Sequence, residues 1–443
     1  MKKHMFFWAI LSITATLLTA QETEPASQAQ NSFGFGLEIG AEVFNEIDDN
    51  GESVPVAYQM VILKPELVFG KFGIGLYVPF HYRFLDDGFD FRDEDWVLQD
   101  GETIADKYLP MFQYIRYGTK GEPLYAKLGS IEDGTLGNGF IMGNYANTRF
   151  LPDKRIFGAS LDLDGSLFSF PYVGVETFVG NLAAFDVFGA RLYGRPILFL
   201  NAPVIKNLEI GATYATDRLP DYNYDFILEE PGAVSMTGFD FQQPLLSNPV
   251  LDLSLFGDFV FQGSTTGSMV GTGGRLLKIL PWTMQVRFIG DDFQPVYFDG
   301  SYDLFRESKY YIYDGLADIK GYTGWFASAG LSVLSDLIVF NMGMEGSLSE
   351  PETDLQYPHL TATFAVKEGL LPGFFFDASY DKRMIKDFDD LVSPENAVIG
   401  ARLNYRAGSA VITLAYNLRY KPDALPGEDE WETTTNLSTS ISF

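Results

Sequence analysis

Apolar and polar residues alternate strictly in segment after segment, and this alternation constrains the fold more than any other feature of the chain. Successive side chains of a β-strand point to opposite faces, so a period of two predicts strands with one apolar and one polar face. Clear examples are residues 35–44, 72–84, 282–288 and 410–420. Their length suits the ~9–11 residues that a tilted membrane-spanning strand needs. The pattern predicts an all-β protein.

The connections between these segments are of two kinds, which mostly take turns along the chain. Short ones include Gly70-Lys71, Gly121-Glu122, Asp164-Gly165, Ser335-Asp336 and 407–409. Long ones are expected at 45–57, 85–106, 131–154, 217–249, 300–322, 381–395 and 421–431. Long loops at one end and tight turns at the other are typical of a single antiparallel up-and-down transmembrane β-barrel. We expect an even number of strands, about 16–20.

The last eleven residues form an alternating segment without charge that finishes on an aromatic residue. Thr433, Leu437, Ile441 and Phe443 share one parity, and polar residues occupy the other. This segment resembles the C-terminal assembly signal of Gram-negative outer-membrane β-barrels, with Ile441 and Phe443 as its signal residues. The resemblance implies recognition by the barrel-assembly machinery and periplasmic chaperones, and contact with outer-membrane lipid. An open sheet edge is not tolerated in lipid, so we expect the last strand to pair with the strand at 35–44.

The beginning of the chain predicts export. Lys2 and Lys3 precede an apolar run at 6–18, and Ala20 offers a small residue for cleavage. We therefore expect a signal peptide at 1–20, a disordered segment at 21–32 and the barrel at 33–443. This mature region is similar to porin-like outer-membrane proteins, including spirochaete-type barrels, which implies location in the cell outer membrane.

Composition agrees with a large barrel and excludes several other classes. The 39 Phe, 24 Tyr and 44 Gly suit aromatic girdles and bends. A net charge of −28 disfavours nucleic-acid binding, and the absence of cysteine rules out disulfides and thiolate metal sites. We expect no cofactor and no resident metal ion.

Charged residues on the polar parity predict the lining of a pore. Charge is costly on a lipid-facing surface, so these side chains are expected to face the lumen. The candidate pore-lining residues are Glu38, Glu42, Arg83, Arg116, Arg287, Arg402, Arg406 and Arg419. Barrel closure is expected to bring the last three arginines near Arg83 and the two glutamates.

The loop at 131–154 is rich in Gly and Asn, yet it carries an apolar patch that includes Phe140 and Tyr145. Such a loop is too apolar to extend freely into water. One interpretation is that residues 137–147, flanked by Arg149, fold inward and constrict the pore. The other is that the loop packs on its neighbours outside the barrel.

The preferred function is a porin-like channel for small solutes with a charged lumen. An alternative is a surface adhesin or structural barrel with an occluded lumen. A weaker alternative is a barrel hydrolase that uses His81, for example with Asp86 and a nearby serine, although no nucleophile-elbow motif is present. The sequence leaves open whether the barrel forms an oligomer, for which the stretch 324–333 is a candidate surface.

Overall fold

The computed structural model describes residues 32–442, apart from 48–52, 86–87, 100–101, 149–154, 201, 203, 221–231, 318, 354–355, 394, 409 and 421–430. The expected signal peptide, the acidic turn at 48–52, Asp86, Arg149 and Phe443 lie outside these residues.

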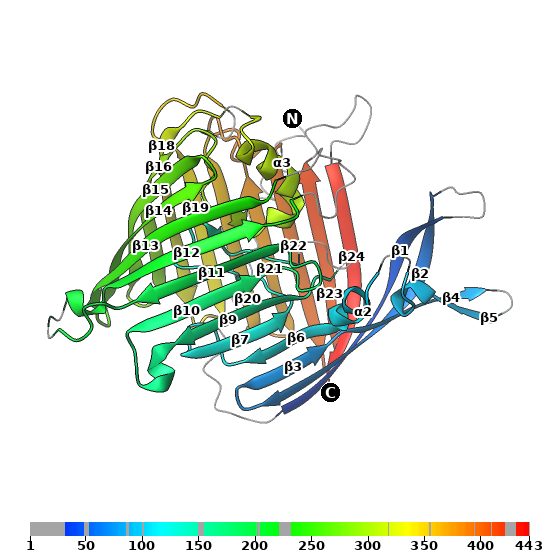
Figure 1. Ribbon diagram of the computed structural model, residues 1–443. Helices are drawn as coiled ribbons and strands as arrows, with labels where there is room; N and C mark the ends of the chain where they lie inside the picture. Colours follow the sequence, from blue (N-terminus) through cyan, green and yellow to red (C-terminus); the bar gives the residue numbers. More distant parts are fainter. Residues whose placement is uncertain are drawn as a thin grey trace.

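Among the described residues, twenty strands form one antiparallel ring in which sequence neighbours are also spatial neighbours (Figure 1). The first ten are β1 (Ser32–Ile47), β2 (Ser53–Phe69), β3 (Phe72–Leu76), β6 (Phe112–Tyr117), β7 (Leu124–Gly129), β9 (Gly158–Asp164), β10 (Val173–Val179), β11 (Val187–Gly194), β12 (Glu209–Asp217) and β13 (Val234–Ser247). The other ten are β14 (Leu251–Gln262), β15 (Thr265–Leu276), β16 (Leu280–Ile289), β18 (Tyr322–Val333), β19 (Ile338–Ser347), β20 (His359–Leu371), β21 (Phe374–Lys382), β22 (Ala397–Ala407), β23 (Ala410–Tyr420) and β24 (Trp431–Ser442). The predicted all-β, up-and-down barrel with an even strand number is confirmed.

The ring closes where the last strand meets the first. Residues Gly36–Ile39 of β1 pair antiparallel with Ser442–Thr439 of β24. The expected pairing of the final segment with the strand at 35–44 is therefore present, although it covers only part of each strand.

Beside this closure the wall is irregular. A break at Tyr77 separates β3 from β4 (Val78–Leu85), which pairs with β2 and with the short β5 (Gly88–Phe91). The 3-10 turn η1 (Asp93–Asp95), the helix α2 (Ile104–Tyr108) and the turn η2 (Leu109–Met111) lead on to β6. Thr103 and Asp106 form a reciprocal capping box at the start of α2. In Figure 1, β1, β2, β4 and β5 extend away from the rest of the ring as a lobe.

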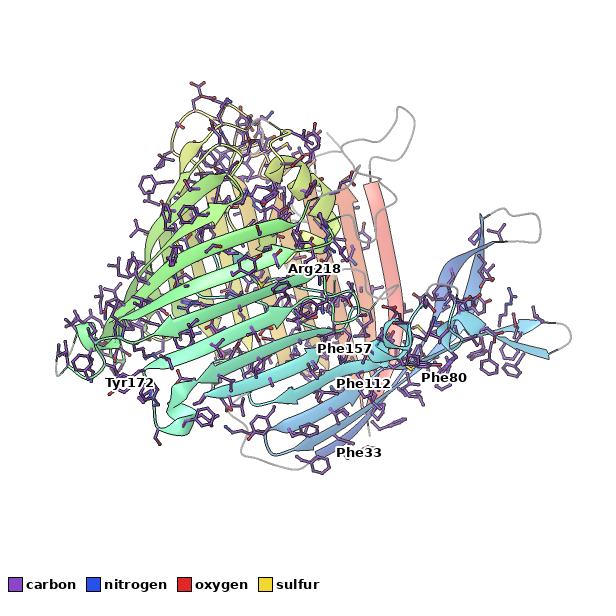
Figure 2. All side chains as sticks on the ribbon, viewed as in Figure 1. Phe33, Phe80, Phe112, Phe157, Tyr172 and Arg218 are labelled. Atoms are coloured by element: carbon purple, nitrogen blue, oxygen red, sulfur yellow. The ribbon has the colours of Figure 1, made fainter. Side chains whose placement is uncertain are left out.

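The outer surface of the ring is apolar. Residues of one parity on successive strands are exposed, and the aromatic side chains among them stand out from the wall (Figure 2). They include Leu192, Ile210, Tyr214, Phe239, Phe259, Val270, Met284, Phe288, Met342, Phe374, Leu403, Tyr405, Leu414, Tyr416 and Leu437. A closed antiparallel barrel with this exterior is the architecture of a membrane barrel of the outer-membrane type.

No helix among the described residues has the length and hydropathy required to cross a membrane. The two longest helices, α2 and α3 (Tyr302–Tyr313), lie in connections between strands.

Several of the expected long loops contain regular structure. The segment 45–57 includes the end of β1 and the start of β2, and 131–154 includes β8 (Met142–Gly143). The prediction of a loop at 217–249 is wrong, because β13 occupies most of the second half of this segment. The segment 85–106 forms the β4–β5 hairpin, η1 and the start of α2, and 300–322 contains α3. The remaining 3-10 turns, η3 (Gly165–Phe168) and η4 (Ile205–Asn207), lie in connections at the end opposite α3.

Candidate functional site

Two long connections from the same end of the barrel fold inward and meet. One joins β7 to β9 and contains β8 (Met142–Gly143), and the other joins β16 to β18 and contains β17 (Phe298–Asp299) and α3. The strands β8 and β17 pair in parallel, and the backbone amide of Val296 donates to the carbonyl of Phe140 at 2.8 Å. We refer to residues 131–147 and 290–317 together as the inner assembly.

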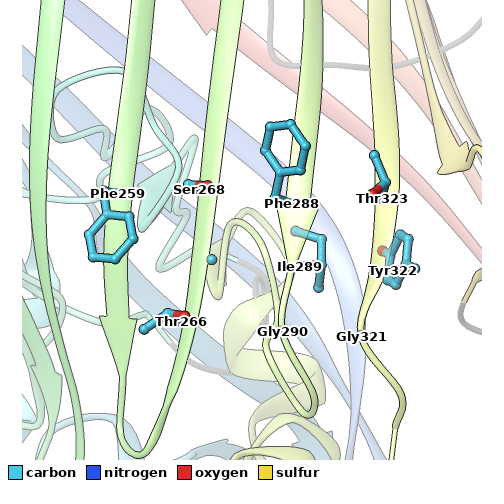
Figure 3. A pocket seen from close by; sticks show the side chains of 10 residues that line it. Phe259, Thr266, Ser268, Phe288, Ile289, Gly290, Gly321, Tyr322 and Thr323 are labelled. Atoms are coloured by element: carbon cyan, nitrogen blue, oxygen red, sulfur yellow. The ribbon is translucent and has the colours of Figure 1, made fainter.

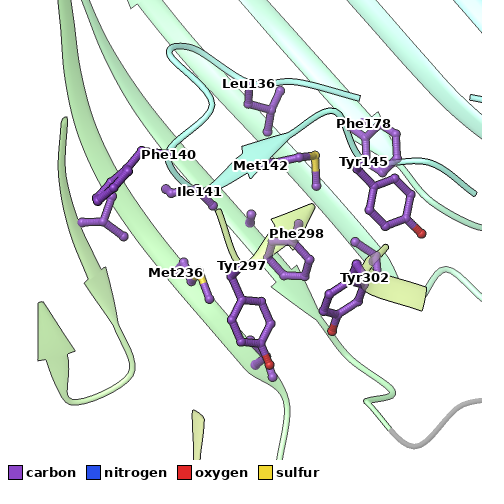
Figure 4. Packing of buried hydrophobic residues seen from close by; sticks show 14 of the residues in the cluster. Leu136, Phe140, Ile141, Met142, Tyr145, Phe178, Met236, Tyr297, Phe298 and Tyr302 are labelled. Atoms are coloured by element: carbon purple, nitrogen blue, oxygen red, sulfur yellow. The ribbon is translucent and has the colours of Figure 1, made fainter. Parts of the chain in front are cut away.

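An apolar cluster joins the inner assembly to one side of the barrel wall (Figure 4). The loops contribute Ile131, Leu136, Phe140, Ile141, Met142, Tyr145, Phe293, Tyr297, Phe298, Tyr302 and Tyr310. The wall contributes Phe178, Val187, Ala215, Val234, Met236, Val260, Met269 and Ile289, from strands β10 to β16. Burial of so much apolar surface is the main force that holds the loops against this wall.

A buried arginine fixes α3 to the ends of two wall strands. The guanidinium of Arg306 donates to both carboxylate oxygens of Asp217, at 2.5 and 2.6 Å, and to Asp186 at 2.9 Å. Arg306 is 1 % exposed and Asp217 is fully buried. The hydroxyl of Tyr302 also donates to Asp217, at 2.6 Å. Buried charges are tolerated only when they are paired and hydrogen-bonded, as they are here.

A second carboxylate in α3 contacts the other loop. The hydroxyl of Tyr145 lies 2.9 Å from one carboxylate oxygen of Asp303. Burial raises the pKa of Asp303 to about 7, and the nearby Arg306 guanidinium only partly opposes this rise. The two loops are therefore joined by a group that titrates near neutral pH.

The turn at the tip of the first loop rests on charged groups of the wall. The amide of Gly137 donates to Glu176 at 3.0 Å, and the side chain of Asn138 donates to Asp258 at 2.9 Å. Gly137 has φ +56°, and a Cβ atom there would lie 2.9 Å from Nε of Arg191. Both the backbone conformation and the close approach require glycine at this position.

Arg191 is the central residue of a charged network beneath the turn at Gly137 and Asn138. It donates two hydrogen bonds to Asp240, at 2.9 and 2.6 Å, and single ones to Glu176 and Glu209. Arg191 is 2 % exposed and Asp240 is buried with it, whereas Glu176 and Glu209 stay partly exposed.

The opposite wall carries charged residues that are only partly covered. His359 bridges Glu345 and Asp381 at 3.3 and 2.9 Å, and Glu345 also pairs with Arg287, which is buried on β16 of the covered side. Further along, Nε of Arg402 lies 2.9 Å from Asp377. The Arg402 side chain is 52 % exposed, and those of Glu345 and Asp381 are 34 % and 33 % exposed. Water therefore reaches the inner face of β19 to β22.

The structure brings together some of the residues predicted to line the pore. Phe140, Tyr145 and Arg287 meet in or beside the inner assembly, and the guanidinium of Arg287 lies 5.9 Å from the ring of Phe140. Arg402 lies on the partly exposed wall.

The other predicted pore residues contact different partners. Glu38 pairs with Lys64, Glu42 with His81, Arg83 with Asp90, and Arg406 with Glu368. The Arg116 guanidinium lies 5.7 Å from the Tyr114 ring on β6. Among the described contacts, Arg402 and Arg406 are not clustered with Arg83, since they lie on β22, which pairs with β21 and β23, whereas Arg83 lies on β4, which pairs with β2 and β5. The side chains of Arg419 and Ile441 lie outside the described residues.

His81 has a different environment from the one considered for a hydrolase. Its Nδ1 lies 2.7 Å from Asp95 and its Nε2 lies 3.0 Å from Glu42. A catalytic histidine needs one ring nitrogen for the nucleophile, but carboxylates occupy both nitrogens here. The geometry is that of an ion cluster between β1, β4 and η1.

Sequence reasoning missed the residues that anchor the inner assembly: Asp186, Asp217, Asp303 and Arg306. One signal could have found part of this set. Tyr302, Arg306 and Tyr310 are spaced four residues apart, which places them on one face of a helix, and that face is buried.

A hollow of about 530 Å³ lies over β14 to β18, near the end of the barrel that carries the long loops (Figure 3). Phe259 and Phe288, which are 44 % and 51 % exposed on the outer face, flank the small residues Ser268 and Thr323. Because its aromatic flanks belong to the outer surface, this hollow opens on the outer face of the barrel.

No family model and no curated protein matches the chain. Among solved structures, OprB from Pseudomonas putida is 10 % identical, with 94 % of each chain covered and a TM-score of 0.29. OccK2 (OpdF) from Pseudomonas aeruginosa is 11 % identical over 93 % of this chain and 98 % of that chain, with a TM-score of 0.33. OccAB4 from Acinetobacter baumannii is 9 % identical over 95 % of this chain and all of that chain, with a TM-score of 0.33. At these scores, the fold is assigned from the strand pairings of the chain itself.

Proposed function

We propose that the protein is a passive channel of the outer membrane for small polar solutes, and that the inner assembly narrows its lumen from the long-loop end. The observation that supports this function most is the uneven filling of the barrel. The inner assembly covers the wall from β10 to β16, whereas the charged wall from β19 to β22 stays in contact with water. The proposed pathway runs between the two.

The charged wall is expected to determine which ions and solutes the channel favours. Rings and opposed patches of charge favour some ions and solutes over others at a constriction. On this wall Asp381 contacts His359 and Asp377 contacts Arg402, and Glu345 contacts both His359 and the buried Arg287 of β16, so each carboxylate has a cationic partner. We therefore propose a weakly selective channel, rather than one specialised for a single ion.

Deletion of residues 137–145 tests the proposal. The deleted segment forms the tip of the first loop, so single-channel conductance in planar bilayers is expected to rise several-fold. A control deletes residues 387–390, which are mostly exposed in a loop at the same end of the ring and lie outside the inner assembly. Unchanged conductance in the deletion variant would contradict the constriction, and silence of the wild-type protein would favour an occluded barrel.

A further inference from the structure

Charged side chains of alternating sign form a row along the inner rim of the barrel at the long-loop end. At this end β19 and β21 finish, β20 begins, and the connection that contains α3 leaves β16. Each member of the row contacts the next one, in the order Arg287, Glu345, His359, Asp381 and Arg383. We refer to these five residues as the rim row.

The inner assembly contacts both ends of the rim row. The guanidinium of Arg287 lies 5.9 Å from the ring of Phe140, and the guanidinium of Arg383 lies 5.2 Å from the ring of Phe305 in α3. The two ends differ in exposure, because the Arg287 side chain is 6 % exposed and the Arg383 side chain is 40 % exposed. Water therefore reaches the row at Arg383 and at its neighbour Asp381, whose side chain is 33 % exposed.

Asp381 and Arg383 contact each other loosely and keep hydrogen-bonding capacity. Nε of Arg383 lies 3.7 Å from Oδ1 of Asp381, which is beyond the usual length of a hydrogen bond. The same Oδ1 lies 2.9 Å from Nε2 of His359. Within the described part of the chain, the Arg383 guanidinium and Oδ2 of Asp381 have no hydrogen-bond partner. Because a guanidinium carries several N–H donors, the pair presents donors directly beside an acceptor.

Such a pair matches a solute that carries both charges close together. In an α-amino acid, the ammonium and carboxylate groups are attached to the same carbon atom, so both can contact adjacent side chains at once. The ammonium would donate to Asp381 and the carboxylate would accept from Arg383, and both hydrogen bonds would be charge-assisted. A solute with a single charge would gain one of these contacts and would be repelled by the other group.

The neighbours of the pair fix its geometry. His359 holds Oδ1 of Asp381 with one ring nitrogen, and its other ring nitrogen lies 3.3 Å from Glu345. The face of the Phe305 ring attracts the Arg383 cation and restricts its motion. The pair is therefore supported from both sides, by the barrel wall and by α3.

We propose that Asp381 and Arg383 form a binding site for small zwitterions of the α-amino-acid class, where solutes enter the proposed pathway. Weak binding at a constriction favours passage, because it attracts the solute without retaining it. The inference rests on the proposed channel function. Failure of the site can be distinguished from failure of the channel, because an uncharged isomer of the zwitterion reports on the channel alone.

Swelling of proteoliposomes in L-alanine and in lactamide, its uncharged isomer, tests the preference. After subtraction of the rate in protein-free liposomes, L-alanine is expected to enter through the wild-type protein at least about twofold faster than lactamide. In Arg383→Gln the two rates are expected to become equal. Lys386→Gln is the matched control and should keep the wild-type ratio, since Lys386 is exposed in the same loop and lies outside the rim row.

The outcomes of the swelling experiment separate the two proposals. If lactamide enters through the wild type and L-alanine enters no faster, the zwitterion site is overturned while the channel stands. Retention of the preference in Arg383→Gln would overturn the site in the same way. Entry of neither solute would overturn the channel and the site together.

Single-channel current in potassium chloride tests binding itself and the role of Asp381. L-Alanine is expected to lower the wild-type current in a saturable manner, lactate to lower it less, and lactamide to have no effect. Asp381→Asn is expected to weaken the effect of L-alanine and to strengthen that of lactate, because the carboxylate that repels lactate is removed. Equal effects of L-alanine and lactate on the wild type would indicate a simple anion site and overturn the proposal. If Asp381→Asn does not insert into bilayers, Arg383→Gln decides, since an undiminished effect of L-alanine there would also overturn it.

Discussion

The two sides of the barrel interior differ in what covers them. From β10 to β16, inward-facing residues such as Met236 and Met269 are buried under the inner assembly, and Arg191 is buried together with Asp240. From β19 to β22, the inward residues are charged and partly exposed. The difference indicates that the inner face of a barrel is not uniformly polar, because a wall that contacts protein follows the packing rules of a soluble core.

Substitution of Arg306 by alanine is expected to have the largest effect on this difference. The change leaves Asp217 and Asp186 buried without their cation, and such a loss typically costs ~3–5 kcal/mol. We expect α3 to leave the wall, so that limited proteolysis cleaves within 290–317 and single-channel conductance rises. Arg218→Ala is a matched control, because Arg218 is exposed and makes one long contact, 3.4 Å to the carbonyl of Phe185. If both variants resist protease as well as the wild type, the ion cluster does not hold the loop.

Phe140→Ala tests the apolar part of the same contact. Phe140 is 2 % exposed and stacks on Phe293 with ring centroids 5.7 Å apart. Truncation of a buried phenylalanine costs ~3–5 kcal/mol when the site cannot collapse, and we expect the lower part of this range because the neighbours are loops. Cleavage of the 131–147 loop and channel noise are expected to increase, whereas Phe140→Leu should stay close to wild type. Equal behaviour of the two variants would show that the ring does not anchor the loop.

The docking of the two loops is expected to depend on pH through Asp303. The folded-state pKa of this carboxyl is raised to about 7 from its usual value of 3.8. Between these values the docked state binds more protons than the undocked state, so docking weakens as pH rises from about 4 to about 7 and then levels off. Protease sensitivity of the inner assembly is therefore expected to increase over the same pH range. In Asp303→Asn this pH dependence should be lost. An unchanged pH profile in Asp303→Asn would assign the dependence to another group.

Arg402→Ala is expected to have the smallest effect on stability and a clear effect on selectivity. The Arg402 side chain is 52 % exposed, and an exposed ion pair contributes at most about 1 kcal/mol. Loss of its charge leaves Asp377 facing the proposed pathway, so the reversal potential in a salt gradient should shift towards cation preference. Asp377→Asn is expected to shift it in the opposite direction. Loss of folding in Arg402→Ala would show that this wall is packed rather than wet.

Alternation predicted strands best where the barrel interior meets water. In β22 and β23, polar residues face inward and apolar residues face lipid, so the period of two is regular. It failed at β13, where Val234 and Met236 face inward under the loops while Phe239 is exposed outside. The apolar residues of this strand therefore lie first on one parity and then on the other. This change obscures the period of two, and for that reason the sequence pattern predicts a loop here.

The inner assembly was less predictable than the wall. The composition of 131–154 suggested a packed loop, but the structure pairs it with residues far along the chain: the contact of Tyr145 with Asp303 spans 158 positions. No local pattern encodes such a contact. In the sequence, Asp186 and Asp217 resemble other polar residues at strand ends. Only the folded structure shows that both carboxylates pair with Arg306.

Cysteine accessibility on the two walls tests the proposed pathway most directly. Ser379→Cys places a thiol on β21, on the same inner face as Asp377 and Asp381. Met269→Cys places one on β15, under the inner assembly. A charged, water-soluble methanethiosulfonate reagent added during single-channel recording is expected to lower the current through Ser379→Cys and to leave Met269→Cys unchanged. Rapid modification of Met269→Cys together with an inert Ser379→Cys would contradict the proposed pathway.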